Sequence, residues 1–101
     1  MSTIEWLQDY YGECCDGEWE HYYGIDIVTL DNQGWLVGID LRDTTLEDCS
    51  FKRIRIERDD NNWVFCRVAD KVFIASGGVK NLEEILTIFR DWVRKCDSER
   101  M

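Results

Sequence analysis

The sequence predicts an α+β domain of two layers, in which a five-stranded antiparallel meander sheet has an N-terminal and a C-terminal helix packed on one face. Apolar residues recur at helical spacing near both ends of the 101-residue chain, whereas the middle alternates between apolar and polar residues. The links between the middle segments are short, which favours antiparallel neighbours. With 45% hydrophobic residues, residues 1–101 can form a single domain around one core.

The first helix is expected over residues 3 to about 11. Ser2 followed by Glu5 fits a capping box, in which polar groups at the helix start satisfy one another. The helix is expected to stop near Gly12, and Gly12 and Gly17 are expected to bracket a loop. The expected apolar face consists of Ile4, Leu7, Tyr10, Tyr11 and Cys14.

A β-hairpin is expected next. A strand-like run begins after Gly24 and ends at Leu30, and a second run alternates apolar and polar residues from Trp35 to Leu41. Gly34 closes the turn between the two runs, where a type II turn requires a residue with positive φ.

Three more strands are expected at residues 51–58, 63–68 and 72–75. They are joined by short turns at residues 59–62 and 69–71, so each strand should lie antiparallel to the next.

The last helix has the clearest pattern. Asn81 and Glu84 fit a second capping box, and Arg94 and Lys95 stand near the end where the helix dipole favours cations. Its apolar stripe consists of Leu82, Ile85, Leu86, Phe89, Trp92, Val93 and Cys96.

The two halves of the chain differ in charge. Residues 1–50 contain twelve acidic residues and one basic residue, Arg42, which gives −11, whereas residues 51–101 contain eleven basic and nine acidic residues, which gives +2. The net charge of −9 repels nucleic acid phosphates and argues against DNA or RNA binding. A basic protein partner fits the acidic half better, although acidic charge can also serve solubility alone.

The composition also limits the compartment and the chemistry. No segment approaches the roughly 20 apolar residues that span a bilayer, and the N-terminus lacks a secretory signal, so a cytoplasmic protein without a membrane contact is expected. The five cysteines are odd in number and form no C-x-x-C motif, which predicts reduced thiols. With one histidine and scattered thiols, neither a metal site nor a cofactor is expected.

Two groups of cysteines could carry nucleophilic chemistry. His21 is close in sequence to Cys14 and Cys15, so a Cys-His pair is geometrically possible, but acidic neighbours disfavour a thiolate. Cys66 begins a stretch that resembles a rhodanese-type sulfurtransferase loop for two residues, and then lacks the glycine that would let the loop wrap the sulfur. Because Cys66 also fits a strand pattern, a place in the core is the simpler interpretation.

The segment from Glu18 to Tyr23 is the strongest candidate for a partner-binding surface. It combines acidic and aromatic side chains next to a loop: Glu18, Trp19, Glu20, His21, Tyr22 and Tyr23. Aromatic residues are enriched among those that dominate binding energy, and loops on a rigid scaffold often carry binding sites. Trp19 has a competing interpretation, because a tryptophan at this position can also fill the core.

Residues 17–41, GEWEHYYGIDIVTLDNQGWLVGIDL, resemble the immunity protein 53 family of bacterial polymorphic toxin systems. The shared features are Trp19-Glu20, Gly24-Ile25, Asp31-Asn32 and Gly34-Trp35, together with Trp6 and Tyr10-Tyr11. The resemblance implies a non-enzymatic protein that binds a toxin domain and blocks its active site or substrate groove. It adds Asp31 and Asn32 to the predicted partner-binding residues.

Three functions are therefore open. The first is an immunity protein, monomeric or weakly dimeric, whose partner is a cognate toxin domain; a basic nuclease would fit the charge of this chain best. The second is a small thiol-dependent enzyme of the sulfurtransferase type that uses Cys66 or Cys15. The third is a generic acidic adaptor with an unrelated protein partner.

Overall fold

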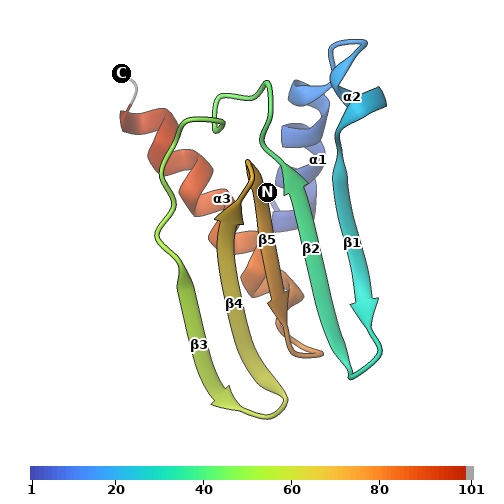
Figure 1. The fold of residues 1–101 in the computed structure, drawn as a ribbon, viewed down its shortest axis with the longest axis vertical. Coiled ribbons are helices and arrows are strands. Elements are labelled where there is room, and N and C mark those ends of the chain that lie inside the picture. The colour runs from blue at the N-terminus through green and yellow to red at the C-terminus, as the bar shows by residue number, and fades with distance from the viewer. Residues whose placement is uncertain (100–101) are drawn as a thin grey trace.

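The computed structural model describes residues 1–99 and confirms the predicted α+β class, with helices on one face of a five-stranded antiparallel sheet (Figure 1). The helices are α1 (Thr3–Cys14), the short α2 (Trp19–Tyr22) and α3 (Leu82–Glu99). The strands are β1 (Ile25–Leu30), β2 (Gly34–Asp40), β3 (Ile54–Asp59), β4 (Asn62–Ala69) and β5 (Val72–Gly77).

The strand order is β1-β2-β5-β4-β3, so the sheet is not the single meander that the sequence predicts. The strands joined by short turns are antiparallel neighbours, as predicted: β1 pairs with β2, β3 with β4, and β4 with β5. Residues 41–53 form a much longer connection, which carries the chain from β2 to the far edge. This leaves room for β5 between β2 and β4, where Ala75 is paired with Val37 on one side and Cys66 on the other.

The core lies between the sheet and the two long helices. The ring of Phe89 on α3 contacts Tyr10 of α1 and Phe73 of β5, with ring centroids 5.2 and 5.0 Å apart. Alternate residues of the central strands face these rings, as a period of two requires. The largest fully buried side chains are Val37, Ile39, Leu41, Leu46, Val64, Cys66, Phe73, Ile85, Leu86 and Phe89.

The glycine in the first hairpin has a different role from the predicted one. Gln33, with φ of 67°, takes the left-handed position of the turn. Gly34 is instead required by close packing, because a Cβ there would lie 2.5 Å from the carbonyl oxygen of Gly77. The hairpin tip therefore depends on a strained glutamine and on a glycine that lets β2 approach β5.

The two predicted helix starts differ. Ser2 caps α1 as expected, since its Oγ accepts a hydrogen bond from the Glu5 amide at 3.1 Å. Asn81 does not form the predicted capping box. Its Oδ1 accepts from the Trp63 amide of β4 at 3.3 Å, and its Nδ2 donates to Glu84 at 3.0 Å. The start of α3 is thereby tied to the sheet.

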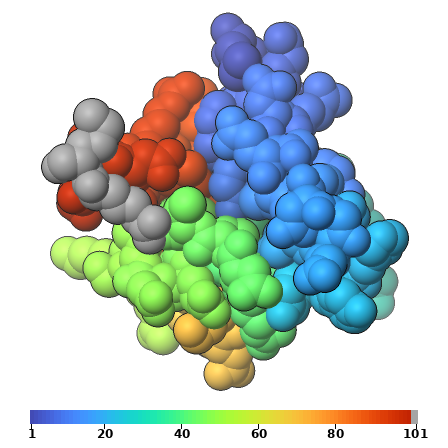
Figure 2. All heavy atoms as spheres, turned by 90° about the horizontal axis from the view of Figure 1, so that it is seen from above, coloured from blue at the N-terminus to red at the C-terminus, as the bar shows by residue number. Residues whose placement is uncertain are grey.

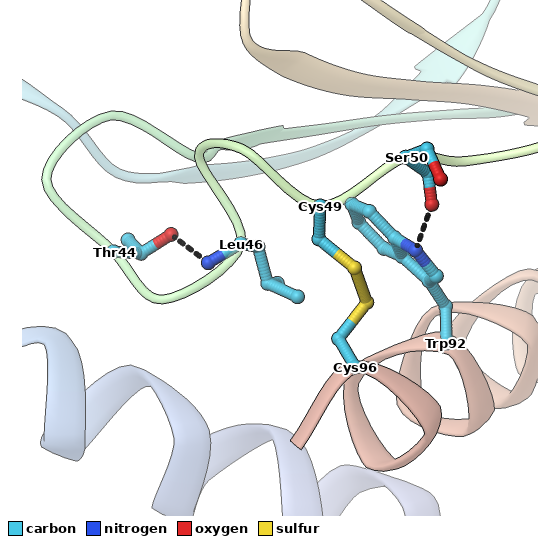
Figure 3. The surroundings of a disulfide bond; sticks show 6 residues. All are labelled: Thr44, Leu46, Cys49, Ser50, Trp92 and Cys96. Carbon is cyan, nitrogen blue, oxygen red and sulfur yellow. Dashed lines mark hydrogen bonds between the residues drawn. A yellow bond between two sulfur atoms is a disulfide. The ribbon is translucent and has the colours of Figure 1, made fainter. Parts of the chain in front are cut away.

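A disulfide joins Cys49 to Cys96, so the prediction that all cysteines are reduced is wrong for this pair (Figure 3). The two residues are 47 positions apart, and the long connection 41–53 brings them together against α3. Trp92 Nε1 fixes the same segment by donating to the Ser50 carbonyl at 2.9 Å. The prediction failed because an odd number of cysteines requires at least one free thiol, but it does not prevent two of the others from forming a disulfide. Cys14, Cys15 and Cys66 are free thiols.

Candidate partner-binding site

The segment before β1 is ordered by its own acidic side chains. The Asp16 carboxylate accepts hydrogen bonds from the Glu18 and Trp19 amides at 3.0 and 2.9 Å, which begins α2. The Glu20 carboxylate accepts from the amides of Asp16 and Gly17. Hydrogen bonds from Trp19 and Glu18 lower the pKa of Asp16, and those from its own amide, Asp16 and Gly17 lower the pKa of Glu20. Both acids therefore stay ionised and hold the loop.

Trp19, one of the residues predicted to bind the partner, anchors this segment from inside. Its side chain is only 2% exposed, and its Nε1 donates to the Arg42 carbonyl at 2.9 Å. Its ring contacts those of Tyr11 and Tyr23, with centroids 6.1 and 6.4 Å away. Figure 2 shows the resulting contact between the blue segment around α2 and the green connection that follows β2. Of the two interpretations left open by the sequence, the buried one is confirmed.

The neighbours of Trp19 point outward. Glu18, His21 and Tyr22 are exposed, and Tyr22 is 78% exposed, which is unusual for so large a side chain. Tyr23 is half-buried, and the Arg42 guanidinium lies 5.9 Å from the centre of its ring. A buried tryptophan thus fixes a short helix whose outer residues are free to contact a partner.

A groove of about 790 Å³ runs beside this helix. Its walls come from α1, the segment between α2 and β1, and the edge of the sheet, and they include Gln8, Tyr11, Tyr22, Tyr23, Asp26 and Asp40. Tyr22 and Tyr23 were predicted as partner-binding residues. Tyr11, which is 42% exposed, was predicted as part of the apolar helix face, and the two aspartates were missed. Strand alternation places Asp26 and Asp40 on the sheet face away from the helices, which the sequence pattern alone could have indicated.

Asp31 and Asn32 lie at the other end of the β1–β2 hairpin from this groove. Because Asp26 lines the groove, the last four residues of β1, 27–30, separate Asp31 from it, a span of about 16 Å. Asn32 lines a different groove with Trp63 and Phe65. The predicted site residues therefore fall into two groups, and only the group at residues 18–23 forms one surface.

The acidic half of the sequence is also one side of the molecule. Residues 1–50 supply both N-terminal helices and the adjacent strands β1 and β2, on the right of Figure 1. Arg42, the only base among them, is used internally: it contacts the Asp40 carboxylate at 3.5 Å and donates to the Asp70 carbonyl at 3.3 Å. The side that carries the candidate site is thus strongly negative.

The thiol sites lack the features of an activated nucleophile. Cys66 is 1% exposed, and burial raises the pKa of its thiol to about 12. Burial also raises the pKa of Cys14. Within residues 1–99, His21 makes no hydrogen bond to Cys14 or Cys15, and no cluster of three potential metal ligands occurs. In the same part of the chain, no helix is long and apolar enough to cross a membrane.

The chain thus combines a small sheet that has helices on one face with an acidic and aromatic groove. Its free thiols are buried at Cys66 and half-buried at Cys14 and Cys15. These features are those of a small α+β protein with a surface suited to protein binding. The sequence profile of the immunity protein 53 family matches residues 4–94, nine-tenths of the chain. The chain therefore belongs to the immunity protein 53 family, which confirms the resemblance found in the sequence, and family membership supports a non-enzymatic immunity protein. No curated protein and no solved structure matches the chain significantly.

Proposed function

We propose that this protein neutralises a cognate polymorphic toxin domain by binding it with the acidic, aromatic surface around α2, and that it thereby blocks the active site or the substrate groove of the toxin. The observation that carries the proposal is a largely exposed tyrosine, Tyr22, at the edge of an acidic groove, on a short helix that the buried Trp19 anchors. Large side chains on a rigid support lose little entropy on binding, so they make effective anchors.

The charge of this side has a second effect. A surface with a charge of −11 over 50 residues and one internally paired base attracts a basic partner before contact. Such steering raises the association rate, and salt weakens it. A toxin that binds nucleic acid through a basic groove fits this surface, because the carboxylates around Tyr22 can occupy positions that phosphates otherwise take.

The first experiment is co-expression with the C-terminal domain of the polypeptide encoded immediately upstream. We expect the chain to restore growth and to form a complex that native mass spectrometry detects. A domain that is toxic alone, forms no complex and is not counteracted would refute the pairing and favour a generic adaptor with another partner.

Point variants then test the surface itself. Replacing Tyr22 by alanine should weaken the complex by at least about tenfold and leave the thermal unfolding temperature unchanged, because the side chain is 78% exposed. Val79→Ala is the matched control, since Val79 is 50% exposed but lies in the connection between β5 and α3. Equal effects of both substitutions would place the contact surface elsewhere.

Glu18 tests the steering. Glu18→Lys should lower the association rate more at low salt than at high salt, with a smaller effect on dissociation. Glu20→Lys is a poorer test, because the Glu20 carboxylate also accepts hydrogen bonds from the amides of Asp16 and Gly17. Losing that carboxylate would disturb the loop as well as the charge. A dissociation rate that changes more than the association rate would assign Glu18 to direct contact.

A further inference from the structure

The two edges of the sheet are built differently. The β3 edge is interrupted by a bulge between Glu57 and Asp59, and an exposed ion pair joins Arg55 to Glu57 at 2.6 Å. Bulges and charges of this kind keep a strand edge from pairing with another strand. The β1 edge has regular pairing with β2 over all six residues and no bulge. The charge of Asp26 is therefore the one protection of this kind on β1.

The side chains of β1 are also unusually apolar for an edge. Ile27 is 37% exposed on the helix side of the sheet, and Val28 is 48% exposed on the opposite side. Apolar residues are thus uncovered on both faces of the same edge strand. A strand added beside β1 would cover both of them.

The backbone of β1 has groups available for such a strand. The Asp40 amide donates a hydrogen bond to the carbonyl of Gly24, the residue opposite it, one position before β1. In an antiparallel ladder, pairs of opposite residues that exchange hydrogen bonds alternate with pairs that do not. The even-numbered residues of β1 therefore bond to β2, while the amide and carbonyl groups of Ile25, Ile27 and Thr29 point away from the sheet. These three residues form the free edge.

Charge decides which strand fits the free edge. The β1 side belongs to the half of the chain with a charge of −11, and Asp26 is exposed beside the free edge. A second copy of this chain would bring two such negative edges together, which costs electrostatic energy. A partner strand with basic residues meets no such repulsion. The groove next to α2 includes Ile25 and Asp26, so the free edge continues directly into the candidate site.

We propose that the free edge of β1 binds an extended segment of the toxin as a sixth, antiparallel strand, with Lys or Arg and β-branched residues in alternation. This inference rests on the proposed function and specifies the mode of binding. Main-chain hydrogen bonds to Ile25, Ile27 and Thr29 supply affinity, and the exposed aromatic residues at α2 supply specificity.

Residue-resolved amide exchange of the isotope-labelled chain tests the proposal, with the upstream-encoded toxin domain as the probe. We expect the amides of Ile25, Ile27 and Thr29 to exchange on the order of 100-fold more slowly in the complex than in the free protein. A complex in which these amides exchange at their free rate would overturn strand addition but leave the proposed function intact. The absence of any complex with a toxic domain would overturn both.

A pair of variants at one position separates the backbone from the side chain. Ile27→Ala removes the exposed side chain and keeps the outward amide, whereas Ile27→Pro also removes the amide without breaking a bond to β2. We expect Ile27→Pro to weaken binding about tenfold more than Ile27→Ala. Equal losses with folded proteins would refute the hydrogen bonds. A stable homodimer of the free chain, with the same three amides protected, would assign the edge to a second copy.

Discussion

The role of Trp19 can be tested by separating stability from binding. Its side chain is 2% exposed and contacts two tyrosine rings, so Trp19→Ala removes a large buried group and leaves a cavity. Such substitutions destabilise proteins by about 3–5 kcal/mol. Trp19→Phe keeps most of the packing but leaves the Arg42 carbonyl without its donor, and should cost about 1–3 kcal/mol. Small domains are stable by only about 5–15 kcal/mol, so the alanine variant approaches the limit of folding.

Urea unfolding followed by far-ultraviolet circular dichroism measures these differences. Binding of the phenylalanine variant should then be measured at low temperature, where it remains folded. We expect its affinity to fall by less than that of Tyr22→Ala, because in the proposed complex Trp19 positions the surface and Tyr22 contacts the partner. An alanine variant within about 0.5 kcal/mol of the parent, with strongly reduced binding, would refute the assignment and make Trp19 a contact residue.

Three further predictions concern the scaffold. Cys49→Ser should lower the unfolding free energy by about 4 kcal/mol for a loop of this length. In excess reductant the parent loses the same disulfide, so its urea unfolding curve should coincide with that of the variant. The hydrogen-bonded ion pair with Arg58 lowers the pKa of Glu84, so the stability that this pair contributes is present above the ordinary pKa of 4.5 and is lost as the pH falls through the lowered pKa. Glu84→Gln should therefore flatten the acid limb of a curve of unfolding free energy against pH. An unchanged acid limb would contradict this. Gly34→Ala should destabilise by about 2 kcal/mol in thermal unfolding, because the new Cβ would meet the Gly77 carbonyl, whereas a neutral effect would show that β2 can shift.

Local patterns predicted the elements well, because their causes lie within a few residues. The period of the apolar residues located α1, α3 and all five strands, and Ser2 with Glu5 marked the start of α1. The short α2 was missed because it depends on side-chain bonds from Asp16 and on the burial of Trp19, and four residues carry no helical period.

Pairings between distant residues were harder to predict. The place of β5 beside β2 follows from the length of the connection 41–53, and the disulfide between Cys49 and Cys96 follows from where that connection runs. Neither has a local pattern. In the candidate site, Tyr22 and Tyr23 were predicted from composition, whereas Asp40 was missed although the predicted β1–β2 hairpin brings it to the same end of the sheet.

The disulfide also divides the chain topologically. The bond between Cys49 and Cys96 closes a covalent ring that contains β3, β4, β5 and most of α3, while the acidic half of the sequence hangs outside it as a tail. One proteolytic cut inside the ring leaves a single covalent molecule. A cut before Cys49 leaves the segment that carries the candidate site attached by noncovalent contacts alone, among them its ladder to β5, its contacts with α3 and the hydrogen bond from Arg42 to the Asp70 carbonyl. The half that carries the candidate site can therefore be lost to a single cleavage, while the half that supports it survives one.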